Sequence, residues 1–470
     1  MNTFSKRILS LIGIITIIFI FTTSVFSDVI ITTRHGINFW HALFEGEILH
    51  FYEYNLNCIY LPQRSETWSA IYNIVIYFIF AIWDFPLWLV EHIFGIDVLG
   101  TLGGLLWGKA IVLPFLVGIA KRIYDICILI MTEKDASDTI FLFLTSGYVL
   151  FTVLSMGQYD VILLFCILNG IYGYLINNNK IFFCSFWLAI PLKLFALFML
   201  IPLVLLKEKS IFKIIFKLLG TCSLYIFTSG MAWILENDAI KEATALQIDI
   251  IRKLFANNIQ LSLMECSLFI MVIIVIYLLC YLTKRELRID NIWIIYIVYI
   301  IYAAFCVLCP TSPQWHILMC PFMMILLVYE KKNRIVLLIL EIVATSSIIL
   351  AQGIYLNNII AANMVDLLWI ADIFGNIRCW EEYNSIYLLL AEFVGNELFA
   401  LILKILVPMY TVSMILFSIF AIPHKLGFKK YLIESTEKSV RYWVLLRSII
   451  GIFLAIIPLL SFIVAKCLGR

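Results

Sequence analysis

Apolar residues fill most of this chain in runs of about 20 residues, which short polar connections separate. A run of that length crosses the ~30 Å hydrocarbon core of a bilayer when it forms a helix. The alternation of apolar and polar residues that is typical of membrane β-barrels is absent from the sequence. The pattern therefore predicts an all-α polytopic membrane protein, with a single helical domain over residues 1–470 and roughly 11 to 13 transmembrane helices.

Charged connections indicate which side of the membrane each helix end faces. Lys6 and Arg7 precede the first apolar run, 8–26, and the positive-inside rule therefore places the N-terminus in the cytoplasm. This run is longer than the apolar core of a typical signal peptide, so we expect an uncleaved anchor, although small residues near Ser27 keep a cleavable signal open. Three mixed-charge segments are predicted to lie on the extracytoplasmic side: 27–68, 235–264 and 353–396.

Two interrupted apolar segments leave part of this topology open. Residues 69–90 are interrupted at Pro86, and residues 181–206 contain two prolines and a lysine. If both segments cross the membrane fully, the turn at Gln158 faces the cytoplasm. If both are broken or re-entrant, Gln158 faces outside with Asp28, and we favour this arrangement because prolines permit it inside a protein.

Composition agrees with a membrane protein and excludes other classes. Hydrophobic residues make up 63% of the chain and charged residues only 14%, whereas about a quarter of the residues in soluble domains are charged. The net charge of +2 gives no indication of nucleic-acid binding. Most of the twelve cysteines lie within apolar runs and read as small buried hydrophobes. Cys58 and Cys379 lie in polar stretches, but we expect no disulfide between them.

The first extracytoplasmic segment holds a dense group of ionisable residues: Asp28, Arg34, His35, His41, Glu45, Glu47, His50 and Glu53. Charged groups are costly at membrane depth, so such a group at a membrane boundary is a functional-site candidate by default. The alternative is an ordinary solvated loop. Apolar residues at spacings of three and four between Ile37 and Phe51 predict a helix that lies along the outer membrane surface.

Asp28 stands where the first predicted span meets this segment. A half-buried carboxylate there would have a raised pKa and accept a proton from a hydroxyl; the alternative is a helix-end residue in contact with water. Arg34 suits a phosphate, and His35 lies at the same boundary, but Arg34 can equally anchor the interface. The histidines His35, His41 and His50 share no helix face, so we predict no metal site.

Two further features place polar groups between apolar spans. The turn Gly157-Gln158-Tyr159-Asp160 exposes an amide and a carboxylate beside a glycine that permits close approach; the alternative is a plain polar hairpin. Lys193 lies in the middle of an apolar run of about 25 residues and is too far from either end to reach water. We therefore expect Lys193 to contact an anion, either a carboxylate or the phosphate of a lipid-linked ligand.

A later polar segment, 313–316, opens another predicted span at its outer end. Its residues Gln314 and His316 are candidates to line the same cavity as Asp28. The alternative is an interfacial position, in which Trp315 anchors the chain in the aromatic belt.

Taken in this order, these pieces resemble the GT-C class of integral-membrane glycosyltransferases. The likeness is to bacterial mannosyltransferase-like proteins related to the second mannosyltransferase of GPI-anchor synthesis and to the protein O-mannosyltransferases. Asp28 resembles the family's acid after the first span, Gly157–Asp160 resembles its GQ-x-D turn, and Lys193 resembles a lysine in a proline-containing span. Segment 312–316 resembles a late outer segment, and the likeness covers roughly residues 1–330.

The resemblance implies a GT-C-like bundle in the cell membrane that moves a sugar from a polyprenyl-phosphate donor to a glycan, lipid or protein acceptor on the extracytoplasmic face. The chemistry of the residues is compatible with this reaction: we expect Asp28 to act as the base and Arg34 and Lys193 to hold the phosphate. Many relatives have a second acid close to the first, and here Glu45 and Glu47 are the nearest substitutes. The remaining candidates for the pocket are His35, Gln158, Asp160, Gln314 and His316. Such a donor carries its own leaving group, so no metal or other cofactor is required.

Two other functions remain open at this point. A transporter or flippase for a polyprenyl-linked sugar or another lipid would use the same phosphate-binding cations without a base, and it often shows internal repeats and paired broken helices. The chain has two interrupted segments but no convincing repeat between its halves. A polymerase or ligase of surface polysaccharide would be another enzyme with a different acceptor.

Overall fold

The computed structural model describes residues 3–60, 67–235, 239–241, 248, 251–253, 255–261, 264–283, 290–355, 365–366, 368–370, 394–423, 436–460 and 463. These residues are predominantly helical, and their strands form three two-stranded ladders of two to four residues each. Cys379 and most of segment 353–396 lie outside the described residues.

The α-helices of the described residues are α1 (Thr3–Thr23), α2 (Ser27–Glu45), α3 (Phe51–Tyr54), α4 (Ile74–Phe94), α5 (Leu102–Ala110), α6 (Val112–Cys127), α7 (Glu133–Leu144), α8 (Asp160–Leu175), α9 (Asn179–Leu192), α10 (Leu197–Lys207), α11 (Ile211–Leu235), α13 (Leu268–Leu282), α14 (Asn291–Leu308), α15 (Cys320–Tyr329), α16 (Arg334–Tyr355), α19 (Asn396–Phe420) and α20 (Glu437–Ala455). Short helical turns are η1 (Ile48–His50), η2 (Val98–Gly100), η3 (Val149–Ser155), η4 (Leu194–Ala196) and η5 (Pro313–Leu318), of which η3 is π-helical.

Six helical segments of the described chain are long and apolar enough to cross a membrane, or seven if α7 and η3, bent by 61°, count as one span. Further apolar helices of 10–17 residues accompany them, among them α8, α9 and α15. This confirms the prediction of an all-α protein with several membrane-spanning helices. The described chain thus holds fewer long spans than the 11 to 13 predicted for the whole chain, in part because segment 181–206 forms two shorter helices, α9 and α10.

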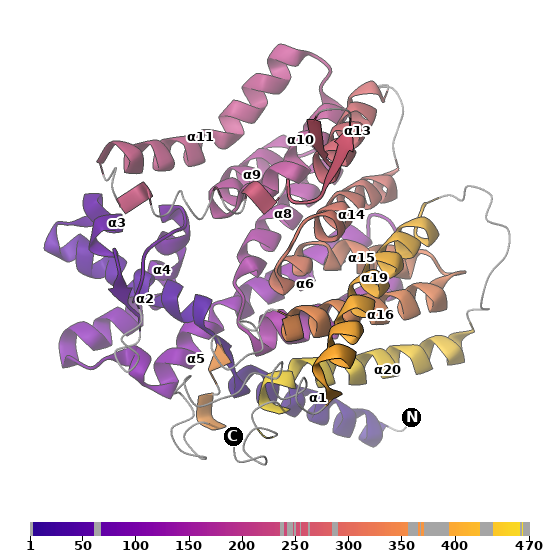
Figure 1. Ribbon diagram of the computed structural model, residues 1–470, viewed down its shortest axis with the longest axis horizontal. Coiled ribbons are helices and arrows are strands. Elements are labelled where there is room, and N and C mark those ends of the chain that lie inside the picture. Colours follow the sequence, from indigo (N-terminus) through magenta and orange to yellow (C-terminus); the bar gives the residue numbers. More distant parts are fainter. Residues whose placement is uncertain are drawn as a thin grey trace.

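The helices form a larger bundle with a smaller lobe at one side. Figure 1 shows α2, α3, α4 and α5 grouped in this lobe, with α11 and α20 at opposite edges of the view. Helix α15 lies deep in the bundle, where its residues from Cys320 to Val328 are all buried. Helix α11 is mostly exposed, with Phe212 and Phe216 among its outward residues, as expected for a surface that faces lipid.

Helices α2 and α4 pack closely because α2 has a glycine at the contact. A Cβ atom on Gly36 would lie 2.9 Å from Cβ of Phe80, so a larger residue would push the helices apart. Helix α2 ends at Glu45, where Gly46 takes the left-handed conformation that glycine favours. Asn73 caps the start of α4, because its side chain accepts a hydrogen bond from the Val75 backbone amide.

Two expectations about these elements were wrong in detail. Helix α4 continues through Pro86, so segment 69–90 is not broken there. The expected surface helix begins at Ser27 rather than near Ile37, and most of its first half is buried in the lobe. Packing against α4 explains both differences, because tertiary contacts override the local preferences of single residues.

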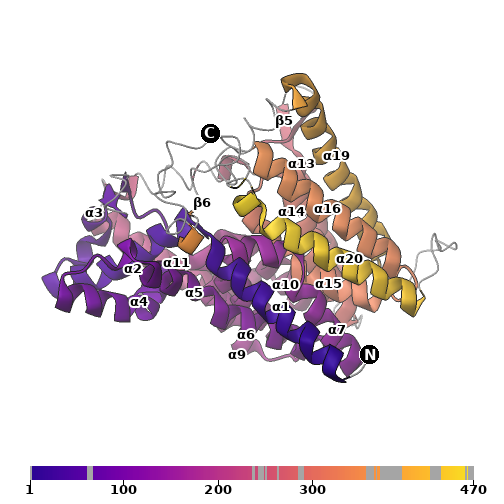
Figure 2. The ribbon, with the colours of Figure 1, turned by 90° about the horizontal axis from the view of Figure 1, so that it is seen from below.

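A short ladder connects the end of the first apolar run, 8–26, with the last predicted outer segment, 353–396. Strand β1 (Val25–Phe26) pairs antiparallel with β6 (Val365–Asp366), with Val25 opposite Asp366. Figure 2 shows α1 running from the N-terminus to this ladder. The beginning of segment 27–68 and strand β6 of segment 353–396 therefore lie at the same end of α1.

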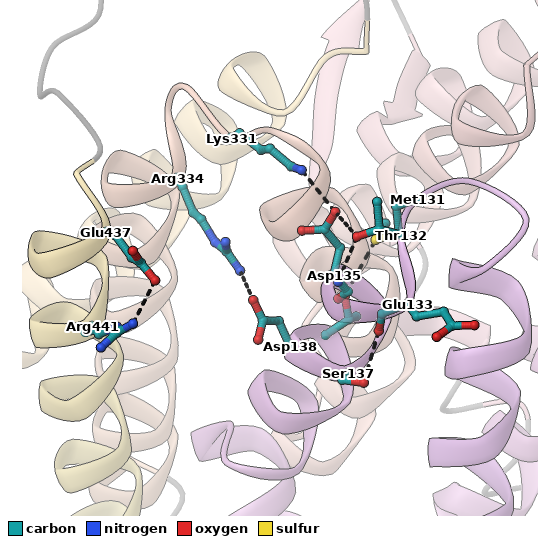
Figure 3. Close-up of polar contacts among 11 residues, drawn as sticks. Met131, Thr132, Glu133, Asp135, Ser137, Asp138, Lys331, Arg334, Glu437 and Arg441 are labelled. Carbon is teal, nitrogen blue, oxygen red and sulfur yellow. Dashed lines mark hydrogen bonds and ion pairs between the residues drawn. The ribbon is translucent and has the colours of Figure 1, made fainter. Parts of the chain in front are cut away.

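Ion pairs collect on the polar connections at the other end of the bundle (Figure 3). Lys331 pairs with Asp135 at 3.0 Å, and Arg334 with Asp138 at 3.5 Å. Figures 1 and 2 place the beginnings of α1 and α20 at this end as well. The basic residues Lys331 and Arg334 thus lie at the end of the bundle where α1 begins, the end that Lys6 and Arg7 predict to be cytoplasmic.

Candidate functional site

Three of the residues singled out in the sequence lie together between α2, α8 and α9. Asp28 is in the first turn of α2, Asp160 begins α8, and Lys193 follows the last residue of α9. The ammonium group of Lys193 forms an ion pair with Oδ1 of Asp160, and both residues interact electrostatically with Asp28. We call Asp28, Tyr159, Asp160 and Lys193 the acid–lysine cluster.

Tyr159 connects the two halves of this cluster. Its hydroxyl donates a hydrogen bond to Oδ1 of Asp28 at 3.3 Å and accepts one from the Thr32 hydroxyl at 3.2 Å. The ring of Tyr72 packs edge-on against the ring of Tyr159, with 6.1 Å between the ring centres. The hydroxyl of Tyr72 also lies beside Asp28. Asp28 is therefore oriented by neutral hydroxyls rather than by a direct cation.

The protein environment of Asp28 favours proton uptake near neutral pH. Removal from water raises the pKa of the half-buried Asp28 carboxyl to about 6; the negative charge of Asp160 adds to this, and Lys193 opposes it. A carboxyl with this pKa is mostly ionised at pH 7 and close to the range in which a general base works well.

The ion pair next to Asp28 keeps spare hydrogen-bonding capacity. Within the described part of the chain, the buried Oδ2 atom of Asp160 has no hydrogen-bond partner. The side chain of Asp160 is 2% exposed and that of Lys193 is 15% exposed, so the lysine is the more accessible of the two. An anionic group that approached Lys193 would thus compete with Asp160 for its protons.

An aromatic wall borders the lysine. The ammonium group of Lys193 lies 5.7 Å from the centre of the Trp315 ring, in the range of a cation–π contact. Trp315 packs in turn against Phe195 at 4.9 Å and Phe305 at 5.9 Å. In segment 313–316, it is therefore Trp315 that contacts the cluster, whereas the sequence had singled out its neighbours Gln314 and His316.

The backbone turn before Asp160 is held tightly against the end of α1. The Phe26 amide donates to the Met156 carbonyl at 2.9 Å, and Gly157 has a positive φ of 78°. Gln158 is buried, and its backbone N–H donates to the Thr152 carbonyl at 2.9 Å. The turn therefore lies at the same end of the bundle as Asp28. Of the two segments expected to be broken, however, only 181–206 is, between α9 and α10, whereas α4 runs through Pro86.

A buried lysine that the sequence did not lead us to single out holds the end of α1 against the end of η3, a contact that we call the α1–η3 junction. Lys109 of α5 is fully buried, and its ammonium group donates to the carbonyls of Phe21, Ser24 and, at 2.9 Å, Ser155. These carbonyls belong to the ends of α1 and η3, where helices leave acceptors without internal partners. A cation inside an apolar run was a visible signal, the same one that pointed to Lys193.

Arg34 lies apart from the cluster, contrary to the role expected for it. Its guanidinium donates to both carboxylate oxygens of Glu91, at 2.9 and 3.1 Å, and to Asp97. Because two carboxylates already neutralise the guanidinium group, it is a poor ligand for a phosphate. The arginine instead ties α2 to the end of α4.

The remaining candidates of the first outer segment are also occupied or distant. His35 is buried, and this lowers its pKa to about 4; its Nε2 lies 3.2 Å from the Trp68 carbonyl. Glu45 ends α2, so it is about 25 Å along the helix from Asp28 and cannot replace it as the base here. Glu47 lies beyond the end of α2, at the N-terminal side of η1.

The histidines predicted to share no face remain separate. His41 lies 3.7 Å from Glu91, and His50 lies 3.2 Å from Glu53 near the surface. Among the residues that the structure describes, no group of three or more His, Cys, Asp or Glu side chains is close enough to hold a metal ion.

His316 points away from the acid–lysine cluster to a second group of buried side chains. Its ring stacks on Tyr148 at 5.9 Å and meets Tyr410 edge-on at 5.4 Å. Gln314, two residues earlier on η5, is half-buried. The prediction that His316 lines the Asp28 cavity therefore finds no support in its contacts.

Comparison with known proteins identified no relative. No family model, no curated protein and no solved structure matches the chain. Functional inference consequently rests on the geometry of the acid–lysine cluster and on the sequence resemblance.

Proposed function

We propose that this protein is a membrane glycosyltransferase of the GT-C type, which moves a sugar from a polyprenyl-phosphate donor to an acceptor hydroxyl on the extracytoplasmic side. One observation carries the proposal: a carboxyl group of raised pKa, Asp28, interacts electrostatically with a half-buried cation, Lys193. A base and a phosphate-binding cation are the two groups that this transfer needs.

Asp28 would act on the acceptor. Its carboxylate takes the proton of the acceptor hydroxyl while the acceptor oxygen forms a bond to the anomeric carbon of the sugar. The hydroxyl of Tyr159, 3.3 Å from Oδ1 of Asp28, holds the carboxylate in place.

Lys193 would act on the donor. As the bond between the anomeric carbon and the phosphate oxygen breaks, polyprenyl phosphate leaves with one more negative charge, which the ammonium group stabilises. Lys193 follows the end of α9 in an extended conformation and is held by one carboxylate, Asp160. This single counter-charge leaves it able to bind an incoming phosphate, unlike Arg34 with its two carboxylates.

A transporter or flippase of a lipid-linked sugar remains the second candidate, because one observation favours it. The chain breaks between α9 and α10 at Lys193, and discontinuous helices with polar groups at the break bind substrates in many transporters. A transporter needs the cation but has no use for Asp28 as a base. The two functions therefore differ in what loss of the Asp28 charge should do.

The test is sugar transfer by purified protein in lipid vesicles, with polyprenyl-phosphate-linked mannose and glucose as radiolabelled donors. We expect Asp28→Asn to lower the transfer rate by about 100-fold or more, the usual contribution of a general base. Glu437→Gln is the matched control, because Glu437 is an exposed carboxylate of α20 at the other end of the bundle. Transfer by Asp28→Asn at the wild-type rate would remove Asp28 from the mechanism.

A further inference from the structure

Four lysines gather where α10 ends and α11 begins. Lys207 is the last residue of α10, and Lys209 lies in the connection between the two helices. Lys213 and Lys217 lie one turn apart on one face of α11. We call Lys207, Lys209, Lys213 and Lys217 the basic patch.

The basic patch lies at the opposite end of the bundle from the acid–lysine cluster. The ammonium group of Lys207 donates to the Tyr174 carbonyl at 3.1 Å, near the end of α8. Asp160 begins that helix, so the patch is about 21 Å along α8 from the cluster. In the proposed orientation this end faces the cytoplasm, where the membrane surface carries anionic lipids.

Little of the positive charge of the basic patch is neutralised by described residues. Glu208 pairs with Lys217 at 3.0 Å. Lys209 donates to three backbone carbonyls at 2.7 to 3.0 Å, which hold its ammonium group in place but carry no formal charge. Lys213 is exposed, and its ammonium group has no partner in the described part of the chain. The patch can therefore accept an anion at Lys213.

Large apolar side chains flank the lysines of α11. Phe212 precedes Lys213 and is 87% exposed, and Phe216 precedes Lys217 and is 80% exposed. Of the six long apolar segments of the described chain, α11 is the least buried, at 11%. Figure 1 shows it along one edge of the molecule. Its outer face is thus continuous with the surface that lipid chains cover.

We infer that the basic patch and the outer face of α11 together bind an anionic phospholipid, with the headgroup phosphate at Lys213 and Lys217 and the acyl chains along Phe212 and Phe216. A free phosphate would use the lysines alone, and a neutral lipid would use the apolar face alone. An anionic phospholipid has both parts in one molecule, and basic groups at the cytoplasmic ends of membrane helices bind such headgroups.

The inference does not depend on the proposed glycosyl transfer. It rests on α10 and α11 at the cytoplasmic end, whereas transfer is assigned to Asp28 and Lys193 at the other end. A bound lipid would add contacts to the least buried long helix of the described chain, so its expected effect is on stability.

The experiment measures thermal unfolding of the full-length protein in a neutral detergent. The probes are dioleoyl phosphatidylglycerol, dioleoyl phosphatidylcholine and inorganic phosphate, each added separately. A ligand that binds only the native state raises the unfolding temperature in a saturable way. We expect such a shift with phosphatidylglycerol, and only a small shift with phosphatidylcholine, which has the same chains but no net charge.

Variants of one lysine test the position of the headgroup. We expect Lys213→Gln to weaken phosphatidylglycerol binding about fivefold, the usual contribution of one lysine near an anionic lipid, and Lys213→Glu to weaken it further. Lys121→Gln is the matched control and should bind as wild type does. Lys121 is an exposed lysine of α6, and the charge next to it, Arg122, already pairs with Asp125 at 3.0 Å.

Three results would overturn the inference. Equal shifts with the two lipids would mean that the protein responds to acyl chains alone. An equal saturable shift with inorganic phosphate would mean a site for a free anion. Wild-type binding by both Lys213 variants would mean that the headgroup lies elsewhere. The shift should persist in Asp28→Asn, so failure of this inference and failure of the proposed function are distinguishable.

Discussion

At the scale of single residues, the surroundings of each charge decide what it can do. Arg34 and Lys193 were equally good phosphate ligands by residue type, yet Arg34 binds two carboxylates and Lys193 one. The partners of Arg34 follow it by 57 and 63 residues, and no local pattern in the sequence announces such a pairing. Asp28 and Lys193 could be singled out because a charge next to or inside an apolar run stands out in any sequence.

The pH dependence of transfer is the first prediction at this scale. Because burial raises the pKa of Asp28 to about 6, the ionised base is lost as the pH falls through 6. We expect the transfer rate to rise about tenfold per pH unit below 6 and to level off above it. The measurement is the rate at saturating donor between pH 4.5 and 8, and a flat profile between 5 and 7 would argue against Asp28 as the titrating base.

Lys109 provides a second prediction for a single residue. Replacement by Met leaves the carbonyls of Phe21, Ser24 and Ser155 without their donor, which costs about 1–3 kcal/mol for an unsatisfied buried group. We expect Lys109→Met to lower the unfolding temperature clearly, while Lys121→Met, at an exposed position on α6, leaves it nearly unchanged. Equal stability of the two variants would show that Lys109 does not fasten the junction.

At the scale of the elements, the apolar pattern predicted that these segments are helical but not where the helices end or how they pack. Helix α4 was expected to break at Pro86 and continues through it, because α2 packs along it at Gly36. Helix α2 was expected to lie on a membrane surface and instead buries its first half. Local pattern sets which residues become helical, whereas contacts between distant segments set where a helix ends and which face is covered.

The turn before α8 gives a prediction for an element. Gly157→Ala forces a non-glycine residue into the left-handed region and places a Cβ atom 2.8 Å from Cγ of Lys109. Gly46→Ala is the matched control, because Gly46 has a similar φ of 82° but open space around it. We expect both variants to lose about 1–2 kcal/mol from the backbone and only Gly157→Ala to lose transfer activity as well. Equal activity in the two would separate the turn from the site.

At the scale of the whole molecule, the described chain has two polar ends. One end carries Asp28, the turn at Gln158 and Lys193; the other carries the ion pairs of Lys331 and Arg334. Lys6 and Arg7 already predicted that the end where α1 begins would be basic, since the positive-inside rule depends on charge alone. The placement of His316 could not, because one helical turn presents neighbouring residues to different partners.

Membrane sidedness follows as a prediction for the whole molecule. We expect a cysteine introduced at Ser69 to react with a membrane-impermeant thiol reagent from outside the cell, and a cysteine at Glu437 to react only after permeabilisation. Each is placed singly in a cysteine-free background. Labelling of positions 69 and 437 from the same side would contradict the proposed orientation of the bundle.

The most direct test of the proposed mechanism separates donor binding from transfer. Equilibrium binding of polyprenyl-phosphate mannose would be measured on wild type, Asp28→Asn, and the double variant Lys193→Met with Asp160→Asn, which removes the cation without leaving a buried carboxylate unpaired. We expect Asp28→Asn to bind the donor as wild type does and to transfer nothing, and the double variant to bind it at least about tenfold more weakly. Unchanged binding by the double variant, or loss of binding in Asp28→Asn, would contradict the roles assigned to these residues.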